Sequence, residues 1–475
     1  MSGTGTQKTK YLLENIGLFS IATFMPKALT FLMIPLYTKY LSTSDYGRID
    51  LLTNTVSLLM PIFTLQIQDA VMRYSIKGKY SSNDVLGVGI RVFLGGGIVL
   101  LILCTVLKQI GIIRIDSVFI LFLFVYYITG TLNNIFSYFC RGINKVGVIT
   151  ISSILSAIIT VICNLLFLLV FKWGVYGYLI ANSLGAIIRV TYIYFRANIR
   201  MYLHWKLEST YISKEMVCFS IPMIFSALSW WIDNASDKYI LTFFSGVSIV
   251  GVYAVASKIP SILVAFGDVI AKAFSISAIK EFDSNDSDGF LGKSYSMFSF
   301  CMVLICLFVM TGNIYFARIL FTNDFFVAWK YVPPLLVAVL FNMLSLFCEN
   351  ILLAIGKTKV ISYTAIVGAI VNTFLNLILI PRFDAYGAAV ATFTGFFIAW
   401  FLRYTLLTSY VEIKHDFKKE VISYAIVMLQ MVLAYRGNQF LVFELIILGT
   451  FIFVNRAYIN IGFIYIKNKC KINQR

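Results

Sequence analysis

Long apolar segments recur along the whole chain, separated by short stretches that contain charged residues, Pro or Gly. Each segment holds about 18 to 25 residues, enough for a helix to cross about 30 Å of hydrocarbon. Continuous apolar runs, such as residues 118–126, lack the alternation of a membrane β-strand. The pattern therefore predicts an all-α integral membrane protein. Its helices, about fourteen in number by the length of a membrane span, are expected at residues 12–37, 49–72, 86–107, 117–138, 146–171, 175–195, 216–240, 250–275, 295–316, 331–354, 360–380, 385–408, 420–435 and 440–463.

Parts of the sequence occur twice in the same order, which is typical of transporters built from repeats. The matched features, in chain order, are Gly142 to Val146 with Gly356 to Val360, Asn164 with Asn376, Tyr176-Gly177 with Tyr386-Gly387, Gly185 with Gly395, and more faintly Pro26 and Gly47 with Pro222 and Gly251. We infer two six-helix bundles related by a parallel repeat. The expected domains are an N-terminal bundle at 1–195, a cytoplasmic linker at 196–215, a C-terminal bundle at 216–410, and two added helices with a basic cytoplasmic tail at 411–475.

Composition agrees with a membrane protein, because 59% of the 475 residues are hydrophobic and 13% are charged, with mean hydropathy +0.85. A net charge of +17 would suggest nucleic acid as the partner of a soluble protein. Here, however, the loops on the side of the termini carry more than twice as many Lys and Arg residues as the opposite loops. The positive-inside rule therefore predicts cytoplasmic termini, and charges that sort by side favour an inner-membrane protein over one that binds nucleic acid. The loops are too short for a soluble domain, so any chemistry must occur in the membrane. We do not expect an enzyme.

Polar residues follow single faces of several predicted helices. A charged side chain at mid-bilayer costs about 2.5–3.5 kcal/mol, so it normally faces a packed interior or a wet cavity. The residues concerned are Lys27 in helix 12–37, Asn54 and Gln68 in 49–72, Asp233, Asp237 and Lys238 in 216–240, Lys258 in 250–275, and Glu349 in 331–354. One interpretation is interhelical hydrogen bonds and buried ion pairs, which are common in membrane proteins. The other is a water-filled cavity between the two bundles.

Lys27 and Lys258 are the cations of greatest interest, because neither has an acidic residue one helical turn away. A cationic cavity suits an anionic cargo such as a phosphorylated lipid headgroup. Asp233, Asp237 and Glu349 are the candidates for coupling to H⁺ or Na⁺, and Lys238, Asn54 and Gln68 are candidate polar residues of the cavity. No catalytic residue, metal site or cofactor is expected. Arginines nearer the helix ends are interpreted as interfacial residues that extend toward lipid headgroups, namely Arg73, Arg91, Arg189 and Arg403.

A family resemblance rests on the segment Pro35 to Gly47, on Gly251-Val252-Tyr253, and on the six-plus-six-plus-two plan of helices. These features resemble the Wzx-type O-antigen and capsule flippases of the multidrug/oligosaccharidyl-lipid/polysaccharide (MOP) exporter superfamily. The resemblance implies a V-shaped, MATE-like pair of bundles that moves undecaprenyl-pyrophosphate-linked oligosaccharide repeat units from the cytoplasmic to the periplasmic leaflet. It also implies that Lys27 and Lys258 contact the pyrophosphate, and that membrane lipids and the polymerase and chain-length proteins of the pathway are partners. The arginine-rich cavity of lipid II flippases is not evident, which makes peptidoglycan precursor a poorer fit.

Two other functions stay open at this point. A MATE-like, cation-coupled drug antiporter should have a cavity dominated by acidic residues, and Lys27 and Lys258 argue against that. A membrane glycosyl polymerase usually needs a large external loop or an acidic catalytic cluster, and neither is visible in the sequence.

Overall fold

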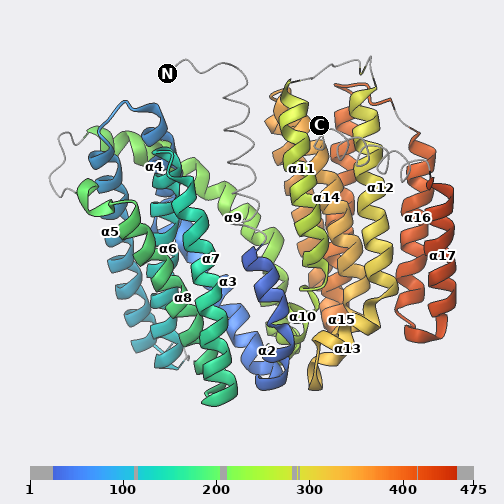
Figure 1. Ribbon diagram of the computed structural model, residues 1–475, viewed down its shortest axis with the longest axis horizontal. Coiled ribbons are helices and arrows are strands. Elements are labelled where there is room, and N and C mark those ends of the chain that lie inside the picture. Colours follow the sequence, from blue (N-terminus) through green and yellow to red (C-terminus); the bar gives the residue numbers. More distant parts are fainter. Residues whose placement is uncertain are drawn as a thin grey trace, which may run out of the picture. The chain divides into compact units, whose positions relative to one another are not determined.

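The computed structural model describes residues 25–111, 116–203, 211–280, 286, 289–414 and 416–456, and these are mostly helical, with no β-strand among them. The all-α class predicted from the sequence is thus confirmed. The chain forms two compact units, Met1–Ser236 and Asp237–Arg475, and the division falls inside helix α9, Tyr211–Ser245. The predicted domain limits at 195, 215 and 410 stay predictions. Each unit is a bundle of helices coloured along the chain in Figure 1.

The first unit begins with helical residues 25–32 and a turn at Met33. Its further elements are α2 (Ile34–Tyr40), α3 (Thr43–Phe63), α4 (Ile67–Lys77), α5 (Ser82–Gln109), α6 (Ser117–Gly142), α7 (Val146–Asn164), the π-helical η1 (Leu165–Val170), α8 (Gly174–Arg196), the short 3-10 helix η2 (Ile199–Tyr202), and the first part of α9. Within the bundle α6 packs on α3, α4 and α8, and α7 pairs with α8. The predicted helices 86–107, 117–138, 146–171 and 175–195 are confirmed.

The predicted helix 49–72 is wrong in one respect, because it is broken into α3 and α4, whose axes differ by 56°. Leu65 takes a left-handed conformation, with φ of 51°, and the Gln66 N–H donates to the Pro61 carbonyl at 3.2 Å. This is a Schellman-type end of α3, formed here without glycine. Gly96 of α5 contacts the break, since a Cβ there would overlap the Phe63 carbonyl. The bend is therefore built into the packing of the unit.

The second unit contains the rest of α9 and ten further elements among the described residues. They are α10 (Val247–Ala256), α11 (Pro260–Lys280), α12 (Phe290–Thr311), α13 (Asn313–Leu320), η3 (Asn323–Lys330), α14 (Val332–Ala354), α15 (Thr358–Thr408), α16 (Phe417–Ala434), η4 (Gly437–Phe440) and α17 (Leu441–Val454) with the turn that follows it. Helix α14 is buried along most of its length and packs on α11, α12, α15 and α16, so it forms the centre of this unit. At Asp384, φ of 48° and ψ of −133° divide α15 into two helices, as predicted at 360–380 and 385–408.

Eight helices among the described residues are long and apolar enough to span a membrane, or ten if the bent pairs α3–α4 and α10–α11 each count as one span. Dividing α15 at Asp384 and adding α16, α17 and the first helix accounts for the fourteen predicted spans. Residues 12–24 of that first helix lie outside the described residues, as do residues 457–463 of the last.

The repeat predicted from the sequence is visible in how matched glycines pack. In the first unit, a Cβ on Gly185 of α8 would overlap Thr160 of α7 and lie 3.1 Å from the Ser156 carbonyl. In the second, a Cβ on Gly395 would lie 2.8 Å from the Asn372 Cβ and 3.0 Å from the Gly368 carbonyl, both in the first half of α15. The same offset in sequence separates Ser156 from Gly368 and Thr160 from Asn372. Corresponding small residues thus bring corresponding helices together in both units.

Candidate functional site

Lys258 lies at a break in its helix rather than in the middle of one. Residues 257–259 form a turn between α10 and α11, whose axes differ by 46°. Pro260 accounts for the break, because it has no N–H to continue the hydrogen-bond ladder and its ring clashes with the preceding turn. The prediction of a continuous helix at 250–275 is therefore wrong at this point.

The side chain of Lys258 is half-buried, and its ammonium makes no hydrogen bond or ion pair with any residue that the structure describes. Its backbone is held locally, since its N–H donates to Val255 at 3.0 Å and its carbonyl accepts from Ser261 at 2.5 Å. The positive end of α11 begins two residues later. The turn thus presents a positively charged group that can bind an anion.

Lys27, the other predicted cavity cation, is part of the first unit. It lies in helical residues 25–32, and its side chain is exposed. Within the same helical segment Thr30 donates to the Pro26 carbonyl at 2.9 Å, so this hydroxyl is used locally. Lys27 and Lys258 belong to different units.

Three polar side chains from α9, α10 and α15 meet in the second unit. Asp237 is 7% exposed and its carboxylate accepts a hydrogen bond from the Tyr253 hydroxyl at 2.8 Å. That hydroxyl lies 3.4 Å from Thr392 Oγ1, and Thr392 donates to the Ala388 carbonyl at 2.9 Å. Asp233 and Lys238, also singled out from the sequence, are half-buried on the same helix. Asp237 is therefore a carboxylate that lies in a group of oxygen atoms from three helices.

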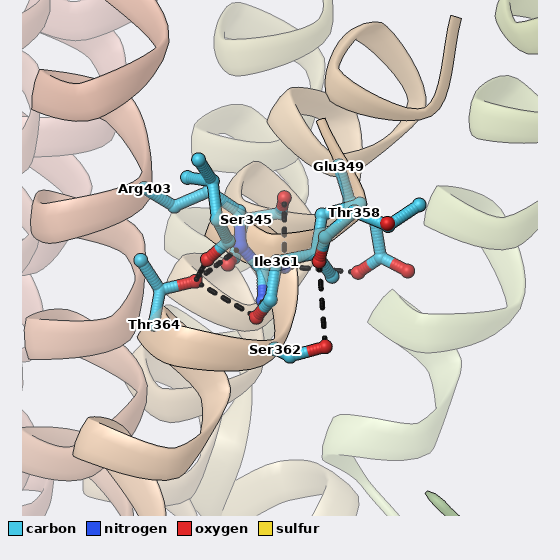
Figure 2. A network of polar contacts seen from close by, with 8 residues as sticks. Ser345, Glu349, Thr358, Ile361, Ser362, Thr364 and Arg403 are labelled. Atoms are coloured by element: carbon cyan, nitrogen blue, oxygen red, sulfur yellow. Dashed lines mark hydrogen bonds and ion pairs between the residues drawn. The ribbon is translucent and has the colours of Figure 1, made fainter. Parts of the chain in front are cut away.

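Glu349 is placed in an ion pair that the sequence analysis did not foresee. Arg403, on the second half of α15, is 5% exposed, and its Nη1 lies 2.9 Å from Glu349 Oε2 of α14. The same guanidinium donates to Thr364 Oγ1 at 3.0 Å and to the carbonyls of Ser345 and Ile361 at 3.4 and 3.2 Å (Figure 2). The interpretation of Arg403 as an interfacial residue is thus wrong, because the protein itself supplies its partners. This arrangement is typical of a structural ion pair that joins three helices.

Asn54 and Gln68 occupy the broken helix of the first unit. The Asn54 amide donates to the Asp50 carbonyl at 2.7 Å and to its carboxylate at 2.9 Å, and the Asn54 carbonyl accepts from Trp231 Nε1 of α9 at 2.8 Å. Gln68, in the first turn of α4, is buried at 7% exposure. Asn54 therefore joins α3 to α9, while the break separates the two residues that the sequence placed on one continuous face.

The start of α9 is joined to the first unit by a polar cluster. Glu215 accepts from the Lys79 ammonium at 2.9 Å and from Tyr74 at 3.1 Å, and it is also hydrogen-bonded by Tyr80. Lys79 lies in the loop between α4 and α5, and its hydrogen bond to the Glu215 carboxylate raises its pKa above the usual value. Arg73, expected at a membrane interface, packs 4.1 Å from the centre of the Phe219 ring of α9.

Sequence reasoning missed a polar face on α16. Glu420, Tyr424 and Gln430 are buried against α12, where Ser296 donates to Glu420 at 2.7 Å and Ser299 lies 2.9 Å from the Tyr424 hydroxyl. Gln430 donates to the Leu307 carbonyl and to Thr311 Oγ1 at 3.1 and 2.7 Å. The helical spacing of Glu420, Tyr424 and Val427 was a signal that could have identified this face.

Comparison with protein families identifies the group to which this chain belongs. Residues 12–274, more than half of the chain, match the model of the family described as polysaccharide biosynthesis protein. The chain belongs to this family. Among curated proteins, a stretch of 68 residues is 37% identical to an uncharacterized membrane protein of Methanocaldococcus jannaschii. That match covers 14% of this chain and 13% of the relative, so the chain spans only a small part of the relative's length.

Solved structures show which fold this polysaccharide biosynthesis protein has. It is similar to the lipid II flippase MurJ in an inward closed conformation, with a TM-score of 0.70 and 16% identity over 95% of this chain and 99% of that one. It is also similar to an inward-facing multidrug resistance MATE family transporter of the MOP superfamily, with a TM-score of 0.63 and 12% identity over 89% and 99% of the two chains. A MATE transporter of Vibrio cholerae matches with a TM-score of 0.59 and 13% identity over 85% and 97%. The protein is a multi-pass membrane protein with the MOP fold, as the sequence resemblance predicted.

Proposed function

We propose that this protein is a flippase that moves undecaprenyl-pyrophosphate-linked oligosaccharide repeat units from the cytoplasmic to the periplasmic leaflet of a bacterial inner membrane. The family match over residues 12–274 carries the proposal, because it connects a membrane protein with polysaccharide biosynthesis. The MOP fold supports transport as the activity, since the solved structures similar to this chain are named a flippase and transporters. O-antigen or capsule is the proposed product. Both termini are proposed to be cytoplasmic, and the polymerase and chain-length proteins of the pathway are the proposed partners.

The mechanism assigns the pyrophosphate to Lys27 and Lys258. Lys258 supports this role, because its ammonium has no protein partner among the described residues and lies where a helix is interrupted. An interrupted helix also leaves backbone groups near the break for a ligand, as in other transporters. The two cations belong to different units. Alternating access is the proposed transport mechanism. An inside-negative membrane potential favours outward movement of each negative charge by about 2.3 kcal/mol per 100 mV.

Coupling to H⁺ or Na⁺ is part of the proposal, and Asp237 is the residue that best supports it. Its carboxylate, the Tyr253 hydroxyl and Thr392 Oγ1 are oxygen ligands from three helices, a set suited to a proton or a hard cation. Glu349 suits this role less well, because Arg403 already neutralises it. Replacement Asp237→Asn should remove any response of transport to the ion gradient. If transport by the wild-type protein is insensitive to both gradients, the coupling part fails while the flippase proposal stands.

A cation-coupled drug antiporter is the alternative, because MATE transporters share this fold. The half-buried Lys258 opposes it, since a cation repels a cationic drug. Vesicle transport of cationic dyes, compared with that of lipid-linked sugars, separates the two functions.

The test in cells uses a strain lacking this protein and complemented with variants. Lys27→Ala and Lys258→Ala should each lower surface polysaccharide and cause complete lipid-linked repeat units to accumulate, with unchanged protein abundance. Lys359→Ala is the matched control, because Lys359 is exposed at the start of α15. Normal export from both lysine variants would contradict the cation mechanism. Accumulation of truncated repeat units would instead indicate a transferase.

A further inference from the structure

Arg189 in the first unit is a charged side chain without a protein partner. It lies in α8, one of the helices apolar enough to span a membrane, seven residues before the end of that helix at Arg196. Its Nε is fully buried and has no hydrogen-bond partner. Its guanidinium as a whole forms no hydrogen bond or ion pair within the described part of the chain. The side chain as a whole is half-buried, and because a charge in apolar surroundings is normally paired, the anion that would pair with Arg189 requires an explanation.

Helix α6 packs on α8, and Arg141 at the end of α6 is a second cation that acts electrostatically on Arg189. Arg141 packs 5.0 Å from the centre of the Tyr138 ring, which holds its guanidinium in place. Nearby, the Lys145 ammonium donates to the Ala197 carbonyl at the end of α8 at 2.9 Å. An anion that lies near both guanidinium groups would be attracted by each of them.

The second unit shows how the protein satisfies a buried arginine when it supplies the anion itself. There Arg403 lies on the helix that corresponds to α8 and one turn beyond Ala399, the position matching Arg189. Glu349 of α14 pairs with it at 2.9 Å. In the first unit α6 corresponds to α14, and the matched glycines Gly142 and Gly356 place Ile135 where Glu349 would be. The first unit therefore lacks the carboxylate that the second unit contains.

We propose that Arg189 and Arg141 bind the phosphate group of an anionic lipid. Guanidinium groups suit this ligand, because their N–H donors match phosphate oxygens in pairs and keep their charge when partly buried. Its location supports a lipid as the ligand, because Arg189 lies on a helix long and apolar enough to span the membrane. Basic groups between such helices bind lipid headgroups. The phosphate comes either from a bilayer phospholipid or from a polyprenyl pyrophosphate. The second source rests on the proposed flippase function, and the first does not.

Native mass spectrometry of the purified full-length protein tests the site. The probes are phosphatidylglycerol, undecaprenyl pyrophosphate, and zwitterionic phosphatidylcholine as the reference lipid. Arg189→Gln should weaken binding of the anionic probe at least about tenfold, because hydrogen bonds to charged groups are lost. Arg189→Lys should give an intermediate loss. Arg196 is an exposed arginine on the same helix. Arg196→Gln should therefore change the affinity for the anionic probe by less than about twofold, as expected for a surface charge.

The outcome also identifies the source of the phosphate. Preference for phosphatidylglycerol assigns a bilayer lipid, and preference for undecaprenyl pyrophosphate assigns the proposed cargo. If neither binds better than phosphatidylcholine, or if Arg189→Gln and Arg196→Gln lose binding equally, the site does not exist. None of these results depends on transport, so the proposed function can fail while this site stands.

Thermal unfolding of delipidated protein provides a second measurement that a purely structural role would not reproduce. Adding the anionic lipid should raise the unfolding temperature of the wild type and leave that of Arg189→Gln unchanged. Without lipid, Arg189→Gln should be at least as stable as the wild type, because the substitution removes a half-buried charge that has no protein partner among the described residues. A lower unfolding temperature for lipid-free Arg189→Gln would show that the protein itself satisfies Arg189, and would overturn the proposal.

Discussion

The ion pair between Glu349 and Arg403 predicts a large and specific loss of stability when one partner is removed. Glu349→Gln leaves the guanidinium of Arg403, 5% exposed, without its counter-charge while keeping the size of the side chain. Breaking a buried pair in this way costs about 3–5 kcal/mol. The Glu349 side chain is 31% exposed, so solvent screening reduces the expected loss to about 2–3 kcal/mol. For a unit of this size that corresponds to a fall of about 4–12 °C in the unfolding temperature.

The assay is thermal unfolding of the purified protein in detergent at one fixed heating rate, because unfolding of such proteins is often irreversible. Glu412→Gln is the matched control, since Glu412 is exposed in the loop after α15. The double variant Glu349→Met with Arg403→Met should recover most of the loss, because two apolar groups leave no unpaired charge. The reasoning about this pair is refuted if Glu349→Gln has the same unfolding temperature as Glu412→Gln. It is also refuted if the double variant is less stable than each of the single variants.

Three further predictions concern packing and buried polar groups. Gly96→Ala should lower stability by about 1–3 kcal/mol, because its Cβ would overlap the Phe63 carbonyl. Gly95→Ala is the control and should not lower stability, because a Cβ there meets nothing within 4 Å. Thermal unfolding compares the two variants. Glu444 is 3% exposed in α17, so we expect a neutral carboxyl that reacts with dicyclohexylcarbodiimide. Glu444→Gln should therefore keep the wild-type unfolding temperature. A large fall in that temperature would indicate a buried carboxylate. Asp286→Ala should speed amide hydrogen exchange in the first turn of α12. The reason is that the Asp286 carboxylate accepts from the N–H groups of residues 291, 292 and 414 at 2.9, 2.9 and 3.0 Å. Unchanged exchange would show that Asp286 does not hold these segments together.

The helices and the repeat were predictable because their signals are local. Long apolar segments fix the positions of the spans, and small residues such as Gly185 and Gly395 recur where helices must approach closely. The break at Lys258 was also visible in principle, since Pro260 follows within two residues. The break of α3 was not, because Leu65 ends the helix in a left-handed conformation that glycine normally adopts.

The partners of charged residues could not be predicted, because they come from distant parts of the chain. Arg403 of α15 and Glu349 of α14 form an ion pair, and the sequence spacing around either residue does not indicate the other as its partner. An arginine near a helix end can thus be an interfacial residue, can form a buried ion pair as Arg403 does, or can be half-buried without a protein partner among the described residues, as Arg189 is. Only the packing of helices separates these cases.

Flipping of a lipid-linked oligosaccharide in vesicles tests the central claim most directly. The purified protein is reconstituted with undecaprenyl-pyrophosphate-linked oligosaccharide, and the fraction of glycan accessible to an added glycosidase is followed over time. The account predicts that wild-type protein makes the inner-leaflet glycan accessible, and that Lys258→Ala does so more slowly than Lys359→Ala. Accessibility that never exceeds the outer-leaflet fraction, with correctly folded protein in the same vesicles, would contradict it.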